Sequence, residues 1–406
     1  MRIAMVSEHA SPLATLGGVD AGGQNVHVAA LAGALADRGH EVVVYTRADR
    51  PSLPRRVAMR PRVQVEHVTA GPAQPVAKDE LLPYMGTFAA GLAQRWADER
   101  PDVVHAHFWM SGLASIRAGA RCGVPVVQTF HALGTVKRRW QGDLDTSPAT
   151  RIDTERWIAG SADRIIATCT DEVAELRAMG VTAEGVDVVP CGVDVSLFTP
   201  AADEIRAGRS APRLLIVSRL VPRKGVEDAI RALALTPAAE LVIVGGPSAD
   251  RLDNDPEVAR LRQVAAECRV AKRVRWTGHL RHDELPAVIR SCDVLLAVPW
   301  YEPFGITVLE AMSCGVPVVA SAVGGLLDTV VPGVTGVLVH GRDPQSIAAG
   351  TGWLLSDEQR RAAMGRAGAE RVRNCYSWPR VAERTEQSYR RALEARSALS
   401  KMAVSR

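Results

Sequence analysis

The chain has 406 residues, 47% of them hydrophobic and 23% charged, and these proportions exclude a disordered chain. Because a single core stops growing near ~250–300 residues, we expect two domains. The net charge of +4, from 49 basic and 45 acidic residues, argues against a nucleic-acid binder.

Short apolar runs alternate with amphipathic stretches through the first half of the chain. Residues 2–7 predict a strand and 24–38 a helix, with Gly39 just past its end. Arginine-rich residues 50–56 read as a polar loop. Further strands are expected at 41–46, 63–68, 102–107, 125–130 and 164–168, with a helix near 80–99. Apolar strands separated by helices indicate a parallel sheet covered on both faces.

A turn-rich break at residues 190–212 precedes a second alternating series. Its strands are expected at 213–218, 240–244, 274–277, 294–298, 317–320 and 336–339. We therefore predict an N-terminal domain over 1–198 and a C-terminal domain over 199–382. A polar helix from about 383 to 406 is expected to pack back on the first domain.

No apolar run approaches the ~20 residues of a membrane-spanning helix, and the N-terminus lacks an apolar signal segment. The seven cysteines are scattered without any C-x-x-C pair. We therefore expect reduced thiols in a cytoplasmic protein, without a disulfide framework or a zinc site.

A glycine-rich loop follows the first strand and contains Gly17, Gly18, Gly22 and Gly23. Glycines let the backbone approach a ligand closely, and the helix that follows offers N–H groups to an anion. Paired glycines do not match the G-x-G-x-x-G fingerprint, so we do not expect a nicotinamide dinucleotide, although Asp49 lies near the ribose position. A flexible loop without a ligand is the alternative.

Two cations stand near the start of the second series. Arg219 follows the predicted strand 213–218, and Lys224 opens the next helix. Because open α/β sheets bind ligands at the carboxyl ends of their strands, both cations should face a ligand. Fixed cations suit a diphosphate, whereas solvated surface cations are the alternative.

Two acids, Glu302 and Glu310, stand eight positions apart around the start of a predicted helix. The amides of Phe304, Gly305 and Ile306 lie at that helix N-terminus, which favours phosphate oxygens. Carboxylates nearby would accept hydrogen bonds from sugar hydroxyls. The alternatives are a solvated loop acid for Glu302 and a first-turn acid stabilised by the helix dipole for Glu310.

In combination these elements resemble the retaining nucleotide-sugar glycosyltransferases of the family that contains sucrose synthase and sucrose-phosphate synthase. The resemblance lies in the E-x7-E element from Glu302 to Glu310, the R-x4-K pair Arg219 and Lys224, and the downstream run CGVPVVAS. It covers essentially the whole chain. It implies the α/β GT-B fold, with two Rossmann-like doubly wound parallel-sheet domains facing across a cleft.

The resemblance also implies roles for individual residues. Arg219, Lys224, His131 and Glu302 would be catalytic, with the two cations neutralising the leaving diphosphate and His131 near the donor sugar. The donor-binding residues would be Gly22, Gly23, Gly245, Phe304, Gly305, Ile306 and Glu310. Among these, Glu310 would hold the ribose hydroxyls.

A narrower likeness lies in the first half, where DAGGQNV and HAHFWMSG look like the mycothiol-pathway enzyme that glycosylates inositol phosphate. In such relatives a phosphorylated acceptor is bound by residues that match Asn25, Lys78 and Arg151. Phe108 and Ala132 stand where the mycothiol enzyme has Tyr and Thr, so two phosphate-facing hydroxyls are missing. We therefore expect a small hydroxylated acceptor, with or without a phosphate group.

No set of His, Cys or Asp residues has metal-ligand spacing, so we expect a metal-independent hexosyltransferase that needs no cofactor. Cations and helix amides would stabilise the departing diphosphate. The resemblance favours UDP as the nucleotide and implies that its base lies near residues 278–281. The resemblance implies retention at the anomeric carbon. The basic cluster 137–139 could hold an anionic acceptor or lipid headgroups, or form a solvated helix face. Both a monomer and a homodimer are compatible with the sequence.

Three other functions stay open. A nucleotide-sugar epimerase or a sugar phosphorylase could share the fold, although nothing resembles a pyridoxal lysine site. A degenerate family member could act as a non-catalytic carbohydrate-binding subunit. The intact Glu302, Glu310, Arg219, Lys224 and His131 argue against that third alternative.

Overall fold

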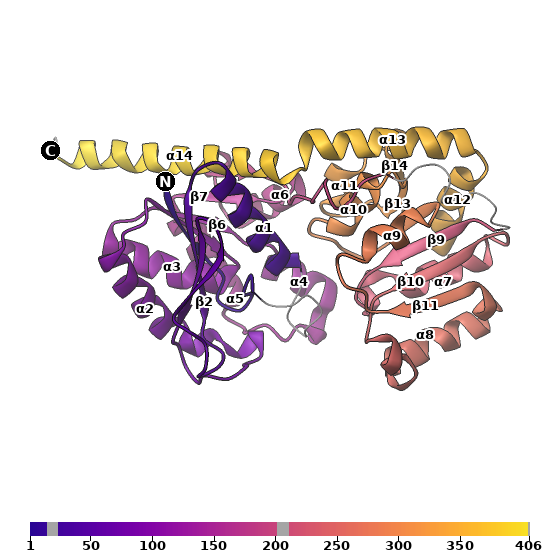
Figure 1. The fold of residues 1–406 in the computed structure, drawn as a ribbon, viewed down its shortest axis with the longest axis horizontal. Coiled ribbons are helices and arrows are strands. Elements are labelled where there is room, and N and C mark those ends of the chain that lie inside the picture. Colours follow the sequence, from indigo (N-terminus) through magenta and orange to yellow (C-terminus); the bar gives the residue numbers. More distant parts are fainter. Residues whose placement is uncertain (14–22, 201–210, 405–406) are drawn as a thin grey trace. The chain divides into compact units, whose positions relative to one another are not determined.

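The computed structural model describes residues 1–13, 23–200 and 211–404. They form two compact α/β units, shown in Figure 1. Unit 1 consists of Met1–Cys191 and Trp378–Arg406, and unit 2 of Gly192–Ser377. The prediction of two α/β domains built on parallel sheets is confirmed.

Unit 1 contains an eight-stranded sheet with the strand order β3-β4-β2-β1-β5-β6-β7-β8. The strands are β1 (Arg2–Val6), β2 (Glu41–Arg47), β3 (Arg56–Arg60), β4 (Val63–Val68), β5 (Val103–His107), β6 (Val126–Thr129), β7 (Arg164–Ala167) and β8 (Val186–Val188). All neighbours are parallel except β3 and β4. The polar loop expected at 50–56 leads into the edge strand β3. The first residue of this strand, Arg56, forms an ion pair with the buried Glu66 of β4.

Helices cover both faces of this sheet. They are α1 (Gly23–Asp37), α2 (Met85–Asp98), α3 (Trp109–Cys122), α4 (Gly134–Gln141), α5 (Arg151–Ser161), α6 (Thr170–Ala178) and α14 (Trp378–Val404). The helix expected from residue 80 begins at Met85, because two short 3-10 turns, Lys78–Glu80 and Leu82–Tyr84, precede it.

The C-terminal helix α14 begins at Trp378, five residues before the expected start. Trp378, Val381 and Tyr389 are buried in the core of unit 1, and Arg38 pairs with Glu386 at 2.7 Å. Unit 1 is therefore built from two distant segments of the chain.

The first boundary between the units also differs from the expected one. It lies at Cys191–Gly192, seven residues before the expected 198–199. Phe198 is fully buried in unit 2, where the Ser313 hydroxyl donates a hydrogen bond of 2.5 Å to its carbonyl oxygen.

Unit 2 contains a six-stranded, all-parallel sheet with the order β11-β10-β9-β12-β13-β14. Its strands are β9 (Arg213–Val217), β10 (Glu240–Val244), β11 (Val274–Gly278), β12 (Val294–Ala297), β13 (Val318–Ser321) and β14 (Gly336–Val339). Its helices are α7 (Val226–Ala234), α8 (Pro256–Glu267), α9 (Leu285–Arg290), α10 (Ile306–Ser313), α11 (Leu326–Thr329), α12 (Pro344–Leu355) and α13 (Glu358–Cys375).

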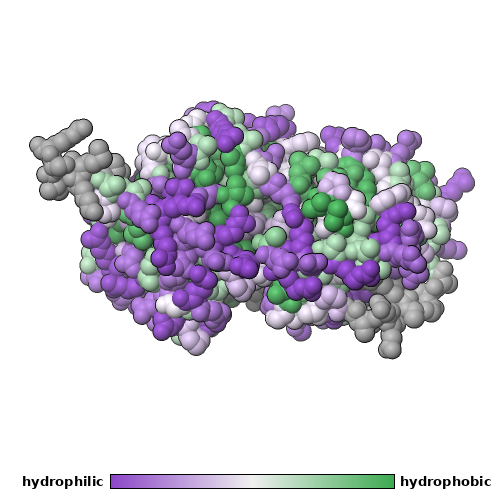
Figure 2. Space-filling model, turned by 90° about the horizontal axis from the view of Figure 1, so that it is seen from above, coloured by the Kyte–Doolittle hydropathy of each residue, from purple (hydrophilic) through white to green (hydrophobic). Residues whose placement is uncertain are grey.

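Each unit has its own apolar core, rich in Val, Leu, Ile and Ala. On the face seen in Figure 2, hydrophilic residues are widespread and hydrophobic residues form smaller groups. Among the described residues, no helix combines the length and hydrophobicity needed to cross a bilayer.

Candidate active site

A charge cluster of unit 2 lies near the carboxyl ends of β9 and β12. The Lys224 ammonium donates a hydrogen bond to Glu302 Oε2, and both side chains are less than one-fifth exposed. Burial alone would raise the pKa of Glu302, but Lys224, Arg223 and Arg219 together lower it. Lys224 ends a short 3-10 turn and does not open the helix, which starts at Val226.

The loop that carries Glu302 leads into the N-terminus of α10. Gly305 is the N-cap residue with φ = 84°, a left-handed conformation that favours glycine. A side chain there would also collide with Leu326. The Gly325 amide donates to the Glu302 carbonyl oxygen at 3.0 Å and fixes this loop. Phe304, Gly305 and Ile306 therefore lie at the helix N-terminus, as the sequence predicts.

The second acid of the E-x7-E element, Glu310, lies one turn into α10 and is 3% exposed. It accepts a hydrogen bond of 2.8 Å from His282 Nε2. Sequence reasoning missed His282. Its position just after the strand β11 is the signal that could have indicated it.

Gly245 directly follows β10, at the carboxyl ends of the strands, where the Lys224–Glu302 cluster also lies. Its φ is 131°, and a side chain would overlap the Ser218 carbonyl oxygen. The close approach of the two chain segments therefore requires glycine at this position.

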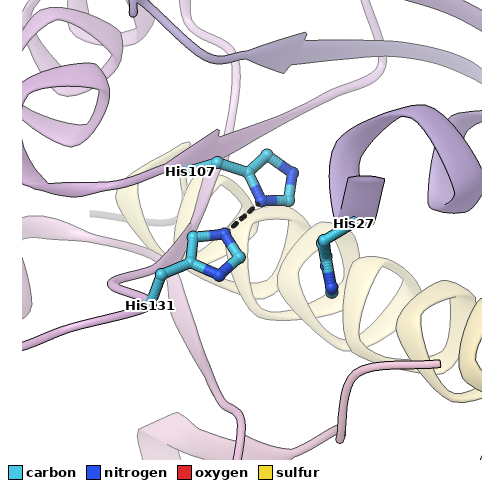
Figure 3. A group of neighbouring side chains, drawn as sticks. All are labelled: His27, His107 and His131. Carbon is cyan, nitrogen blue, oxygen red and sulfur yellow. Dashed lines mark hydrogen bonds between the residues drawn. The ribbon is translucent and has the colours of Figure 1, made fainter. Parts of the chain in front are cut away.

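Three imidazoles from three elements meet in unit 1 (Figure 3): His27 on α1, His107 ending β5, and His131 just after β6. His107 Nδ1 and His131 Nε2 share a hydrogen bond of 3.0 Å, and the His27 ring stands edge-on to His131 with centroids 5.0 Å apart. Burial lowers the pKa of His27 to about 4 and holds those of His107 and His131 well below 6.5. All three are therefore neutral at physiological pH.

Further hydrogen bonds support this group. His105, two residues before His107 on β5, bonds to the Thr129 hydroxyl at 2.9 Å and to the Tyr389 hydroxyl of α14 at 2.8 Å. His131 itself has a backbone φ of 61°, which is uncommon for a residue other than glycine. Such conformations persist where the surrounding structure imposes them, often at functional sites.

The same three histidines are a potential metal-ligand group that sequence spacing did not reveal. Their nitrogens lie within 4.8 Å of one another. Tetrahedral zinc with Zn–N bonds of about 2.1 Å needs nitrogens roughly 3.4 Å apart. Moreover, the hydrogen bond between His107 and His131 already engages two of the nitrogens. The arrangement is therefore that of a hydrogen-bonded imidazole group.

The two cations that the resemblance assigns to the acceptor meet at Phe108. Lys78 Nζ lies 5.7 Å and Arg151 Cζ 5.2 Å from the centroid of its ring. Arg151 is 2% exposed, and its guanidinium donates to Glu155 at 2.7 Å and to the Ala132 carbonyl at 2.6 Å. Protein groups thus hold Arg151 in place within unit 1.

The remaining assigned residues lie at the start of α1. Asn25 is 4% exposed and donates to the Ser11 carbonyl at 2.9 Å. Gly23 is the exposed first residue of α1. Gly22 lies outside the described residues, so its role stays a prediction.

A buried acid just after β1, Glu8, was also missed by sequence reasoning. It accepts hydrogen bonds from the Ser111 hydroxyl and, at 2.6 Å, from His9 Nδ1. The His9 ring packs edge-on against Phe108 with centroids 4.9 Å apart, so this acid supports the surroundings of Phe108.

Two family models match the chain in succession. The model described as Glycosyltransferase Family 4 matches residues 21–197, and the one described as Glycosyl transferases group 1 matches residues 203–371. Together they span most of both units.

Full-length relatives agree with these models. The D-inositol 3-phosphate glycosyltransferase of Acidothermus cellulolyticus is 38% identical, over 100% of this chain and 94% of the relative. The enzyme of the same name from Streptomyces scabiei is 37% identical, over 97% of this chain and 91% of the relative.

Solved structures share the architecture. Sucrose-phosphate synthase from Thermosynechococcus elongatus matches with a TM-score of 0.88 and 32% identity, over 97% of this chain and 99% of that one. HepE of Anabaena, solved in complex with UDP-glucose, matches with a TM-score of 0.72 at 21% identity, over 96% and 99% of the two chains, and shares the GT-B-like fold.

Proposed function

The chain belongs to the glycosyltransferases that these two family models describe, and we propose that it is a retaining, metal-independent hexosyltransferase. The donor would be a UDP-sugar, and the acceptor a small hydroxylated molecule with or without phosphate. The observation that carries the proposal is the cluster of Lys224, Arg219 and Glu302 beside the N-terminus of α10.

In this proposal the donor diphosphate binds to that cluster. Lys224 and Arg219 would neutralise the charge that develops as the bond from the sugar to the diphosphate breaks. The amides at Phe304–Ile306 would donate to phosphate oxygens, aided by the helix dipole. Glu302 would accept hydrogen bonds from sugar hydroxyls, and Glu310 from those of the ribose.

The transfer step exchanges one C–O bond for another. The acceptor oxygen would bond to the anomeric carbon on the face that the diphosphate leaves, and a phosphate oxygen would take the acceptor's proton. No side-chain base is then required. His131, which is neutral, would donate or accept a hydrogen bond at the donor sugar and would carry no charge.

The acceptor site in this proposal surrounds Phe108. Relatives named for D-inositol 3-phosphate support a polyol phosphate. The Phe108 ring, which lies near both Lys78 and Arg151, has no hydroxyl that could donate to a phosphate. This favours an acceptor whose binding depends less on a phosphate group. Acceptors should therefore be compared as phosphorylated and unphosphorylated pairs.

The relatives named above are glycosyltransferases, which favours transfer over epimerisation, phosphorolysis or a non-catalytic role. Independence from metal, a cytoplasmic location and the oligomeric state stay predictions.

The deciding experiment has three steps. Thermal shift with UDP-, GDP- and ADP-sugars should reveal the donor, because a ligand that binds only the folded state stabilises it. Mass spectrometry with myo-inositol, D-inositol 3-phosphate and other polyol pairs should then reveal transfer, and NMR of the product should show the donor's anomeric configuration. Activity should survive EDTA. Inversion, a metal requirement or release of an epimerised donor would each contradict part of the proposal.

A further inference from the structure

The loop between β11 and α9 places His282 directly on the acid that the proposed function assigns to the donor ribose. His282 Nε2 donates to Glu310 Oε1 at 2.8 Å. The Glu310 side chain is 4% exposed and that of His282 28% exposed. No partner of the other oxygen, Glu310 Oε2, is found among the described residues.

Three chain segments hold the imidazole in this position. The Phe198 ring packs edge-on against it with centroids 5.1 Å apart. Phe198 is itself fixed to α10, because the Ser313 hydroxyl donates to its carbonyl oxygen at 2.5 Å. The His282–Glu310 pair therefore lies where three segments meet: residues 194–198, the loop after β11, and helix α10.

The charges around His282 favour its protonated form. Its hydrogen bond to Glu310 raises its pKa above the usual 6.5, burial opposes this, and the negative charges of Glu310, Asp194 and Asp283 add to the rise. Asp283 is itself paired with Arg281 at 2.7 Å. Protonation of His282 thus offsets part of the cost of burying the Glu310 carboxylate.

We infer that His282 is a positioning residue that orients the Glu310 carboxylate, with Oε1 occupied by the imidazole and Oε2 turned to the vicinal hydroxyls of a ribonucleoside diphosphate. This inference rests on the proposed function. It deepens that function by assigning the preference for a ribose over a dideoxyribose to His282 and Glu310. A sugar without the two hydroxyls has nothing to donate to Glu310 Oε2.

The test measures how His282 and the ribose hydroxyls depend on each other. Calorimetry of the full chain compares UDP with 2′,3′-dideoxy-UDP for the wild type, His282→Ala and His282→Gln. Lys272→Ala is the matched control, since Lys272 is an exposed residue of the same unit that the proposed donor site does not include. We expect His282→Ala to weaken UDP binding about tenfold and to leave dideoxy-UDP nearly unchanged. His282→Gln, which keeps an N–H donor, should recover part of the loss, and the control should match the wild type.

The pH dependence of UDP affinity separates this role from a role in packing alone, which would not depend on the protonation of His282. As pH rises through the raised pKa of His282, the charge-assisted hydrogen bond becomes a neutral one. Wild-type affinity for UDP should therefore fall as the pH rises above the ordinary histidine pKa of about 6.5, and the His282→Gln profile should be flatter.

Three results would overturn the inference: equal losses for both nucleotides, unchanged UDP binding, or tighter UDP binding in His282→Ala. If the wild type binds none of UDP, GDP or ADP, the proposed function fails instead, so the two failures are distinguishable. Should His282→Ala not fold, His282→Gln and the pH series decide.

Discussion

Replacing Lys224 by Met removes one charge from the centre of the proposed donor site and keeps most of the side-chain volume. In the structure the Lys224 ammonium bonds to Glu302, with side chains 19% and 17% exposed. Removing one preorganised electrostatic group typically costs 10²–10³ in kcat, about 3–4 kcal/mol. We expect a loss of that size in UDP release, with a smaller change in KM.

The same substitution should lower stability, because Glu302 loses its ion pair with Lys224 while Arg223 and Arg219 stay near it. For a pair that is mostly but not fully buried, we expect about 1–3 kcal/mol. The pKa of Glu302 is depressed below its usual 4.5 in the wild type and should rise in the variant. A depressed carboxyl pKa stabilises the fold above about pH 4.5 and ceases to do so as pH falls through the folded value. The stability gap between wild type and variant should therefore narrow in acid.

The measurements are steady-state UDP release with the identified donor and thermal unfolding followed by tryptophan fluorescence at several pH values. Lys272→Met is the matched control, since Lys272 is an exposed lysine of the same unit. A kcat within about threefold of the wild type for Lys224→Met would refute the assigned role. A stability gap that widens in acid would refute the electrostatic account of Glu302.

Three further predictions concern unit 1. Phe108→Tyr should raise kcat/KM for a phosphorylated acceptor relative to its unphosphorylated partner, by roughly tenfold for one added hydrogen bond to an anion; an unchanged ratio in paired assays would place the phosphate elsewhere. Because burial keeps the pKa of His131 well below 6.5, its neutral form should serve across pH 6.5–8, so His131→Asn should lower kcat by about 10–100-fold without changing the shape of the pH profile in that range. Tyr389→Phe removes the hydroxyl that bonds to buried His105 at 2.8 Å and should destabilise unit 1 by about 1–3 kcal/mol in urea unfolding. Binding of UDP itself, without the sugar, should be unchanged, and a loss of UDP affinity would contradict the assignment of the diphosphate to the cluster of unit 2.

Much of the fold could be predicted because its signals are local. The short apolar runs within β2 and β12 are mostly buried, and the alternation of such runs with amphipathic stretches predicted both sheets. The edge strand β3 was missed because none of its five residues is fully buried and Arg56 meets its partner, Glu66, only through pairing with β4. The start of α14 was misplaced because Trp378 is buried by the core of unit 1, which lies far away in the sequence.

The chain by itself determined the residue types that a sugar-nucleotide site needs and their spacing around strand ends, because neighbouring positions on a loop or helix turn are bound to lie close together. Tertiary structure alone decided which distant groups meet. Strand order brings His107 and His131 together, and His282 reaches Glu310 across 28 positions. Burial then decided their charges, leaving the first two imidazoles neutral while Glu310 favours the protonated form of His282. Protonation depends on desolvation and on charges that only the folded chain assembles around a group, so no spacing rule could have supplied it.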